Sequence, residues 1–299
     1  MGALTKLSPI ENLMAIAVPM IWGMGIVFAK GAIEHFPPIL LMALRFTLTA
    51  SVLVWFTKIP HGNLIKLFFI AIVAAAVQYS LTFTGLKGLD AGIAALVVQL
   101  EVPFLVLLGA LLLGEKPGLR KWIGIAIAFC GVGLIARQGE FGGSLNAVFL
   151  VIGGGFTWAL GQVFIRKLKD VDGMQVTAWI AVFATPQLFV MSLIFENGQI
   201  EAVRNADAIV WGAVIYLGLV MTAIGYFFWN TLIRRHDVGR VAPFLLLLPL
   251  FSILGGIVFL GEQPEASKLL GGAVVLLGVA IITIRPKLFA ASREASIKH

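Results

Sequence analysis

Ten long apolar runs, joined by short polar connections, decide most of what this chain can fold into. A helix needs roughly 20 residues, each rising about 1.5 Å, to cross the hydrocarbon core of a bilayer. Most of the runs approach or exceed that length, and the fifth and the tenth are clearly shorter. We therefore predict an all-α polytopic membrane protein with ten transmembrane helices. The runs are 12–29, 39–57, 67–86, 91–114, 122–136, 141–165, 173–195, 208–233, 241–261 and 269–284.

The composition excludes a soluble fold. Of the 299 residues, 60% are hydrophobic and 12% are charged, whereas soluble domains carry about 25% charged residues. The connections are too short for a separate globular domain, so we expect one membrane domain. Cys130 is the only cysteine and the histidines lie in loops or in the tail. This pattern predicts no disulfide, no metal site and no cofactor.

The basic residues are distributed unevenly across the predicted membrane. With alternate connections assigned to opposite sides, one side holds 16 Lys and Arg residues and the other holds five, while Arg45 lies within a run. Because cytoplasmic loops carry the excess of Lys and Arg, both termini are predicted to be cytoplasmic. Such loops meet anionic lipid. We therefore interpret the net charge of +7 as suited to anionic membrane lipid, and we expect membrane lipid and not nucleic acid as a partner.

The second half of the chain repeats the first. A shift of 147 residues places LGEKP at 113–117 on LGEQP at 260–264. The same shift pairs Tyr79 with Tyr226, Asp90 with Asp237, Gly92 with Gly239, Gly109 with Gly256, Lys121 with Lys268, Gly124 with Gly271, and Gly131 with Gly278. In the first helix of each half, a shift of 136 superposes Trp22, Gly25, Phe28 and Lys30 on Trp158, Gly161, Phe164 and Arg166.

The repeat has a consequence for topology. We predict repeats at 12–137 and 141–285, followed by a cytoplasmic tail at 286–299. Each repeat holds five helices, an odd number, so the two must cross the membrane in opposite directions. Inverted repeats of this kind are an architecture of secondary transporters, in which the substrate site lies between the halves. The pattern predicts two inverted-topology repeats around a central cavity.

Ten helices in two halves, each with Leu-Gly-Glu-x-Pro at Glu115 or Glu262 before a Gly-rich last helix, resemble the EamA-type branch of the drug/metabolite transporter superfamily. Within that branch, the chain is similar to bacterial exporters of aromatic and other neutral amino acids. The resemblance implies an inner-membrane protein with a cavity bounded by helices 1, 3, 4, 6, 8 and 9. It places helices 5 and 10 at the periphery. The working expectation for the oligomeric state is a monomer.

Two charged residues lie inside the predicted helices. Glu101 falls near the middle of the fourth helix, where a charge facing lipid costs at least about 2.5 to 3.5 kcal/mol. It either binds a substrate ammonium group or couples protons, or else it has a structural role, as a pair with Arg45 or through a hydrogen bond into the bundle. Arg45 lies nearer the outer end of the second helix. We assign it a structural or gating role, with snorkelling to the interface as the alternative.

Prolines interrupt the fourth and ninth helices at nearly equivalent places, because Pro103 shifted by 147 falls beside Pro249. Each proline lacks an N–H and can free a backbone carbonyl toward a cavity. Paired interruptions are a sequence pointer to a transporter site. Both are candidate gating residues, and a kink that improves packing is the alternative.

Uncharged polar and aromatic side chains inside the apolar runs complete a candidate substrate site. Amide and hydroxyl groups need partners in lipid, and rings with a few amides suit a neutral zwitterion. A helix-to-helix contact is the alternative at each position. The candidates, besides Glu101, are Trp22, Gln78, Tyr79, Gln99, Trp158, Gln162, Tyr226 and Asn230. Trp55, Trp122, Trp211 and Trp229 lie near the ends of runs and are interpreted as an interfacial belt.

The leading hypothesis is a secondary transporter that exports aromatic and other neutral amino acids by alternating access. The alternatives are export of other small metabolites or cationic drugs, a channel, or a membrane-embedded enzyme. An enzyme would need a nucleophile with a base, or metal ligands, at membrane depth. The apolar runs contain no His and no Asp, so we predict that the protein is not an enzyme.

Overall fold

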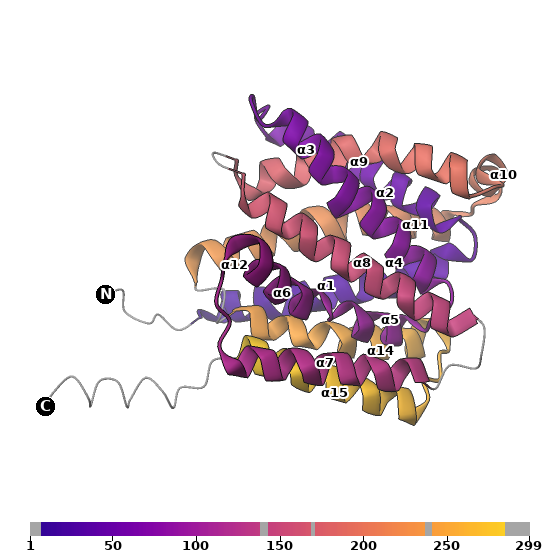
Figure 1. The fold of residues 1–299 in the computed structure, drawn as a ribbon. Coiled ribbons are helices and arrows are strands. Elements are labelled where there is room, and N and C mark those ends of the chain that lie inside the picture. Colours follow the sequence, from indigo (N-terminus) through magenta and orange to yellow (C-terminus); the bar gives the residue numbers. More distant parts are fainter. Residues whose placement is uncertain (1–6, 138–142, 169–170, 237–240, 285–299) are drawn as a thin grey trace, which may run out of the picture.

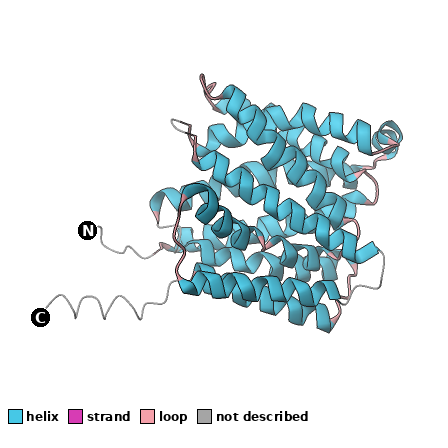
Figure 2. Ribbon diagram, in the orientation of Figure 1, coloured by secondary structure: helices cyan, strands magenta, loops and turns pink. Residues whose placement is uncertain are grey.

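The computed structural model describes residues 7–137, 143–168, 171–236 and 241–284. These residues form helices and the loops between them, without a strand (Figure 1, Figure 2). Within this described part, ten helices are long and apolar enough to cross a membrane. The predicted all-α fold with ten membrane helices is therefore confirmed. The predicted tail at 286–299 lies outside the described residues.

Six of the ten spans are essentially single helices, and four change conformation inside the membrane. The single ones are α1 (Pro9–Ile33), α2 (Pro38–Leu53, continued by η1, Val54–Phe56), α7 (Leu119–Arg137), α8 (Gly143–Arg166), α9 (Gly173–Phe195) and α15 (Ala266–Thr283). The others are α3 (Leu64–Ala71) with η2 (Ile72–Val77) and α4 (Gln78–Leu86); α5 (Ala91–Val98) with α6 (Glu101–Leu113); α11 (Ala208–Ile215) with η3 (Tyr216–Ile224) and α12 (Gly225–Arg235); and η4 (Ala242–Leu247) with α14 (Leu248–Leu260). A short helix, α10 (Gln199–Asn205), lies in the connection before α11.

Several helices begin before the apolar runs, because capping and charged residues occupy their first turns. At the start of α1, the Ser8 N–H donates to Glu11 Oε2 over 2.9 Å and the Glu11 N–H donates to Ser8 Oγ over 3.3 Å, which forms a capping box. α7 begins at Leu119 and α15 at Ala266, so these helices are 19 and 18 residues long. They begin before the runs 122–136 and 269–284, because runs cut at charges omit the first turn, and they remain among the shorter of the described spans.

The outer surface of the bundle is apolar. Leu111, Leu193 and Leu270 are 78%, 71% and 69% exposed, and other large apolar side chains share this exposure. Soluble monomers rarely carry contiguous apolar patches of this extent. The solvent around these helices is therefore lipid, where the backbone polar groups must be satisfied within each helix.

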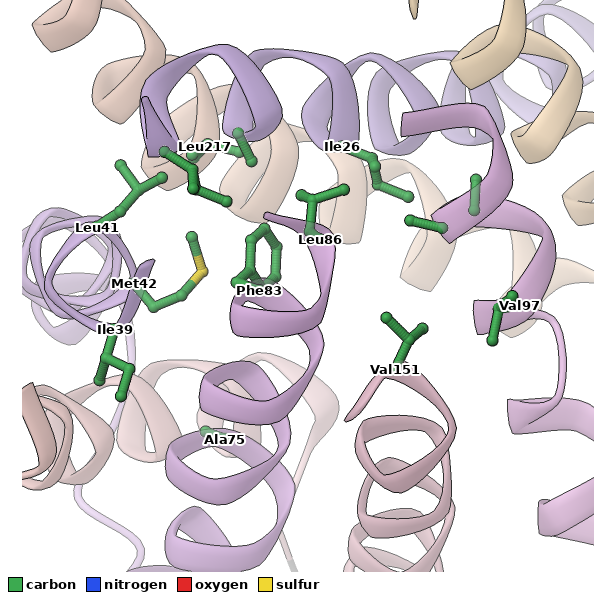
Figure 3. Packing of buried hydrophobic residues seen from close by; sticks show 14 of the residues in the cluster. Ile26, Ile39, Leu41, Met42, Ala75, Phe83, Leu86, Val97, Val151 and Leu217 are labelled. Carbon is green, nitrogen blue, oxygen red and sulfur yellow. The ribbon is translucent and has the colours of Figure 1, made fainter. Parts of the chain in front are cut away.

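The buried core lies between helices from both halves of the chain. Figure 3 shows Leu41 and Met42 of α2, Phe83 of α4 and Leu217 of η3 gathered between the helices that carry them. All four are at most 4% exposed. The core thus joins residues about 130 positions or more apart in the sequence and holds the two halves as one unit.

The order of elements in the first half recurs in the second. Under the shift of 147 residues, α6 and α14 cover equivalent positions. α4 and α12 begin at the equivalent residues Gln78 and Gly225, each directly after a π-helical segment. The third and eighth spans are therefore widened at the same depth of their repeats, a feature that the sequence patterns did not predict.

α7 and α15 lie side by side at the edge of the bundle (Figure 1). A Cβ placed on Gly131 would lie 2.8 Å from Gly271 O, and one on Gly278 would lie 2.6 Å from Gly124 O, so the two backbones touch. The start of α7 meets the end of α15, and the helices run antiparallel. The shift of 147 turns the pair Gly124–Gly278 into the pair Gly271–Gly131. Equivalent helices of the two halves thus make the same contact twice.

The two Leu-Gly-Glu corners share a backbone shape and differ in their partners. Each ends its helix at a glycine with positive φ. Glu262 Oε1 accepts from the Ala91 N–H at the start of α5 over 2.8 Å. Burial raises the pKa of the Glu262 carboxyl, and this N–H opposes the rise. Glu115 instead forms a 2.9 Å ion pair with Arg166, on a largely exposed surface. Each corner thus contacts a helix of the other half, Glu262 through a backbone N–H of α5 and Glu115 through an ion pair with α8.

Candidate functional site

A cavity of about 350 Å³ lies inside the bundle, between the second, third, sixth, seventh and eighth spans. Five residues predicted for the site line it, namely Arg45, Tyr79, Trp158, Gln162 and Tyr226. From Arg45 the cavity extends to the end of the bundle where α9 begins. The resemblance implied a cavity bounded by helices 1, 3, 4, 6, 8 and 9. This expectation agrees with the structure only in part, because the first, fourth and ninth spans do not line this cavity.

Arg45 is the charged group of the cavity. Its side chain is 1% exposed, so it does not snorkel to the surface. Nε and Nη2 donate to Thr222 Oγ1 over 3.3 and 3.1 Å, and Nη2 also donates to the Tyr79 hydroxyl over 3.5 Å. The guanidinium carbon lies 4.7 Å from the centre of the Tyr79 ring and 5.4 Å from that of Phe46. Cation–π contacts of this kind are favourable when desolvated.

The aromatic side chains around Arg45 pack in two groups. Tyr79 stacks on Phe83 with centroids 5.7 Å apart and meets Phe46 edge-on at 5.0 Å. Tyr226 lies 5.3 Å from Trp22, centroid to centroid. Rings packed in this way hold their faces in fixed orientations. Both groups are therefore preformed.

Trp22 and Trp158, which the repeat makes equivalent, have different surroundings. The Trp22 indole N–H donates to Met221 O over 3.1 Å, and its ring packs on Tyr226 and Trp229. Trp22 thus packs α1 against α12. Trp158 lines the cavity, and its indole N–H donates to no described residue. Trp22 in the first half is thus packed against other helices, whereas the equivalent Trp158 in the second half faces the cavity.

Glu101 begins α6, directly after the break in the fourth span. Its carboxyl forms no hydrogen bond or ion pair with any described residue, and the structural pair with Arg45 is not formed. A Cβ placed on Gly155 would lie 3.5 Å from Glu101 Cγ, so the side chain faces α8. Glu101 does not line the cavity itself. Before the break, Gln99 Nε2 donates to Leu245 O of the ninth span over 3.3 Å.

The remaining predicted residues lie near the cavity without lining it. Pro103 is in the first turn of α6 and Pro249 in the first turn of α14, and both are buried. Gln78 Nε2 donates to Thr82 Oγ1 over 3.2 Å, while Gln78 Oε1 is buried and has no partner in the described part of the chain. Asn230 belongs to α12, and its side chain lies outside the described part of the structure.

Three cavity residues were missed or misinterpreted from the sequence. Trp229, interpreted as part of an interfacial belt, lines the cavity and packs on Trp22. It lies three residues after Tyr226, which is on the same helix face, and this spacing was the available signal. Thr222 and Phe46 also line the cavity. A threonine or phenylalanine in an apolar run has no pattern that separates it from a packing residue.

These observations define a multi-pass membrane protein with a preformed polar and aromatic cavity inside the bundle. Residues 9–137 and 145–284 match the EamA-like transporter family. The chain belongs to this family and is therefore a membrane transporter.

Several relatives cover almost the whole chain. A protein of Salmonella typhimurium and one of Escherichia coli K12, each named probable amino-acid metabolite efflux pump, are 29% identical over 91% of this chain and 94% of their own length. An uncharacterized transporter of Bacillus subtilis, YvbV, is 27% identical over 92% of both chains. A crystal structure that is 21% identical superposes with a TM-score of 0.65, covering 93% of this chain and 97% of the other. This last likeness supports the fold alone.

Proposed function

We propose that this transporter exports aromatic and other neutral amino acids across the bacterial inner membrane. The observation that carries the proposal is the cavity, which combines the rings of Tyr79, Trp158 and Tyr226 with the amide of Gln162. The Gln162 amide forms no hydrogen bond with any described residue and can serve a ligand. Small-molecule sites have volumes of about 300 to 1,000 Å³, mostly apolar walls and a few polar groups. The cavity fits a single amino acid.

The relatives support amino acids as cargo and efflux as the direction. Two of them carry a name that refers to efflux of amino-acid metabolites, and their alignments span nearly the full length of both chains. The aromatic preference rests on the cavity walls instead. A substrate ammonium group can also lie against these ring faces.

Alternating access between two inverted five-helix repeats is the proposed mechanism. Its support is the antiparallel contact of α7 with α15, together with the unequal states of equivalent parts. Trp22 is packed and hydrogen-bonded while Trp158 faces the cavity. Glu262 accepts from the N–H at the start of α5, whereas Glu115 pairs with Arg166 of α8. If the halves exchange these states, the cavity closes at its present mouth and opens at the opposite end.

The present mouth is proposed to be cytoplasmic. The cavity reaches Val171 and Gly173, and Gln175 and Trp179 of α9 both donate to Lys58 O. The mouth therefore lies at the end of the bundle with the Lys- and Arg-rich connections, which the charge bias places inside the cell. An exporter in this state is ready to accept substrate from the cytoplasm. We propose a monomer as the working unit, since the cavity is built from one chain.

The test is uptake of labelled phenylalanine, tryptophan and threonine into proteoliposomes preloaded with unlabelled amino acid. We expect saturable, competable uptake, with phenylalanine and tryptophan ahead of threonine. Trp158→Ala removes a cavity wall and should reduce uptake roughly tenfold, the equivalent of about 1.4 kcal/mol. Trp122→Ala, on the exposed side of α7, is the matched control and should leave uptake unchanged. Absence of uptake by folded protein would remove the amino-acid claim and leave the transporter family intact.

Export of organic cations is the second candidate, and the unpartnered carboxyl of Glu101 is the observation that favours it. Cation exporters need an acidic group at membrane depth, where an isolated charge is costly and functional. The same proteoliposomes can be offered labelled tetraphenylphosphonium. Uptake of this cation that phenylalanine does not compete with would favour the second candidate.

A further inference from the structure

Arg45 is a buried cation without an acidic partner. The ion pairs among the described residues are Arg166–Glu115, Arg235–Glu11, His236–Glu11 and Lys268–Glu265, and Arg45 is in none of them. Its described partners are two neutral hydroxyl groups, the Met42 thioether and two ring faces. Positive charges inside membrane proteins usually pair or face a functional cavity. Arg45 faces a cavity, and its charge is not neutralised there.

The guanidinium retains donors for a ligand. It carries five N–H groups in a planar fork that matches the two oxygens of a carboxylate. Nε and Nη2 use the hydroxyls of Thr222 and Tyr79, whereas Nη1 has only Met42 Sδ, at 3.9 Å. A thioether sulfur is a weak acceptor. Nη1 can therefore donate to an anion that enters the cavity.

The hydroxyl groups around Arg45 also leave donors available to an anion in the cavity. Thr222 Oγ1 donates to Leu217 O over 2.9 Å, so its oxygen presents lone pairs to the guanidinium and its proton is already used. The Tyr79 oxygen accepts from Arg45, and no described acceptor takes the Tyr79 proton. Arg45 and Tyr79 both line the cavity, so the guanidinium and the Tyr79 O–H are two neighbouring donors in its wall. A charge-assisted pair of this kind is strong when water is excluded.

We propose that Arg45, with the Tyr79 hydroxyl, binds the α-carboxylate of the transported amino acid and so restricts transport to substrates with a free carboxylate. This inference rests on the proposed function and adds the group that selects the substrate class. The repeat sharpens it, because α9, the second helix of the second half, contains no Lys or Arg. The carboxylate site therefore belongs to the first half alone. Amides and amino alcohols of the same side chain lack the charge and should be rejected.

The experiment compares ligands that differ in one group. Unlabelled phenylalanine, phenylalanine amide and phenylalaninol compete against labelled phenylalanine uptake in wild type, Arg45→Gln, Tyr79→Phe and Arg204→Gln. In wild type we expect phenylalanine to compete at least about tenfold better than the amide. Arg45→Gln should reduce this ratio to about one, and Tyr79→Phe should reduce it several-fold. Arg204 is exposed on α10, outside the cavity, so Arg204→Gln should keep the wild-type ratio.

A binding measurement separates this inference from the proposed function. Thermal stabilisation of the purified protein is measured with 3-phenylpropionate, which has only the carboxylate, and with phenethylamine, which has only the amine. Stabilisation of wild type by 3-phenylpropionate that disappears in Arg45→Gln supports the carboxylate site even if no amino acid is transported. An unchanged amide ratio in Arg45→Gln, or no response of wild type to phenylalanine and 3-phenylpropionate, overturns it. Tyr79→Phe keeps the charge and decides the matter if Arg45→Gln fails to fold.

Discussion

At the scale of single residues, the two Leu-Gly-Glu corners allow a matched comparison. Glu262→Ala removes the acceptor for the Ala91 N–H at the start of α5, and losing such a cap costs about 1 to 2 kcal/mol. Among the described residues, Glu115→Ala removes an ion pair with Arg166 whose side chains are 42% and 55% exposed, and such pairs contribute about 0 to 1 kcal/mol. Thermal unfolding in detergent should show the larger loss for Glu262→Ala. Equal losses would contradict a difference between the corners.

A single site residue can be predicted from the sequence when its side chain is unusual in a membrane-spanning helix. Arg45 and the polar aromatic residue Tyr79 stand out in an apolar run, so the sequence indicated them as site candidates. It could not give Arg45 its present role, because the choice between snorkelling and facing a cavity depends on the tertiary position of Thr222. Trp229 was misinterpreted because a tryptophan near the end of a run is also typical of the interface.

At the scale of helices, the contact of α7 with α15 makes a sharp prediction about two neighbouring glycines. A Cβ on Gly131 would lie 2.5 Å from Val275 N, whereas one on Gly133 has nothing within 4 Å. Alanine is favoured over glycine in a helix by roughly 1 kcal/mol, so Gly133→Ala should be neutral or stabilising. Gly131→Ala must push two backbones apart and should destabilise by about 1 to 3 kcal/mol. Thermal unfolding of both variants in detergent checks this, and equal shifts would exclude the close backbone contact.

The helix breaks show what a sequence can and cannot indicate about elements. Pro103 and Pro249 lack an N–H, so breaks in the fourth and ninth spans were predicted. The π-helical segments η2 and η3 contain no proline and were missed. π-Helical turns insert one residue into the hydrogen-bond ladder and are frequent at functional sites. The packing of neighbouring helices decides whether they form, and no local pattern records that packing.

At the scale of the molecule, the repeat is visible in the sequence and the direction of the cavity is not. Equivalent residues such as Trp22 and Trp158 have nearly the same local sequence, so nothing in the chain says which of them is packed and which faces the cavity. If the halves form the proposed inverted repeat, either arrangement is possible, and this structure shows one of them. The difference between Trp22 and Trp158 depends on the conformation of the protein, so only the three-dimensional structure could show it.

The orientation of the whole molecule in the membrane can be tested with single cysteines. Cys130→Ala removes the only native cysteine and provides the background for His61→Cys and Asn205→Cys, both at exposed positions in connections predicted on opposite sides. With 16 Lys and Arg residues on one side and five on the other, the side that holds His61 should be cytoplasmic. A membrane-impermeant maleimide should therefore label Asn205→Cys in intact cells, and His61→Cys only after permeabilisation. Reversed labelling would mean that the protein has the opposite orientation in the membrane. Because the cavity mouth lies at the end with Lys58, the mouth would then face the outside of the cell. The present state would be ready to release substrate instead of accepting it.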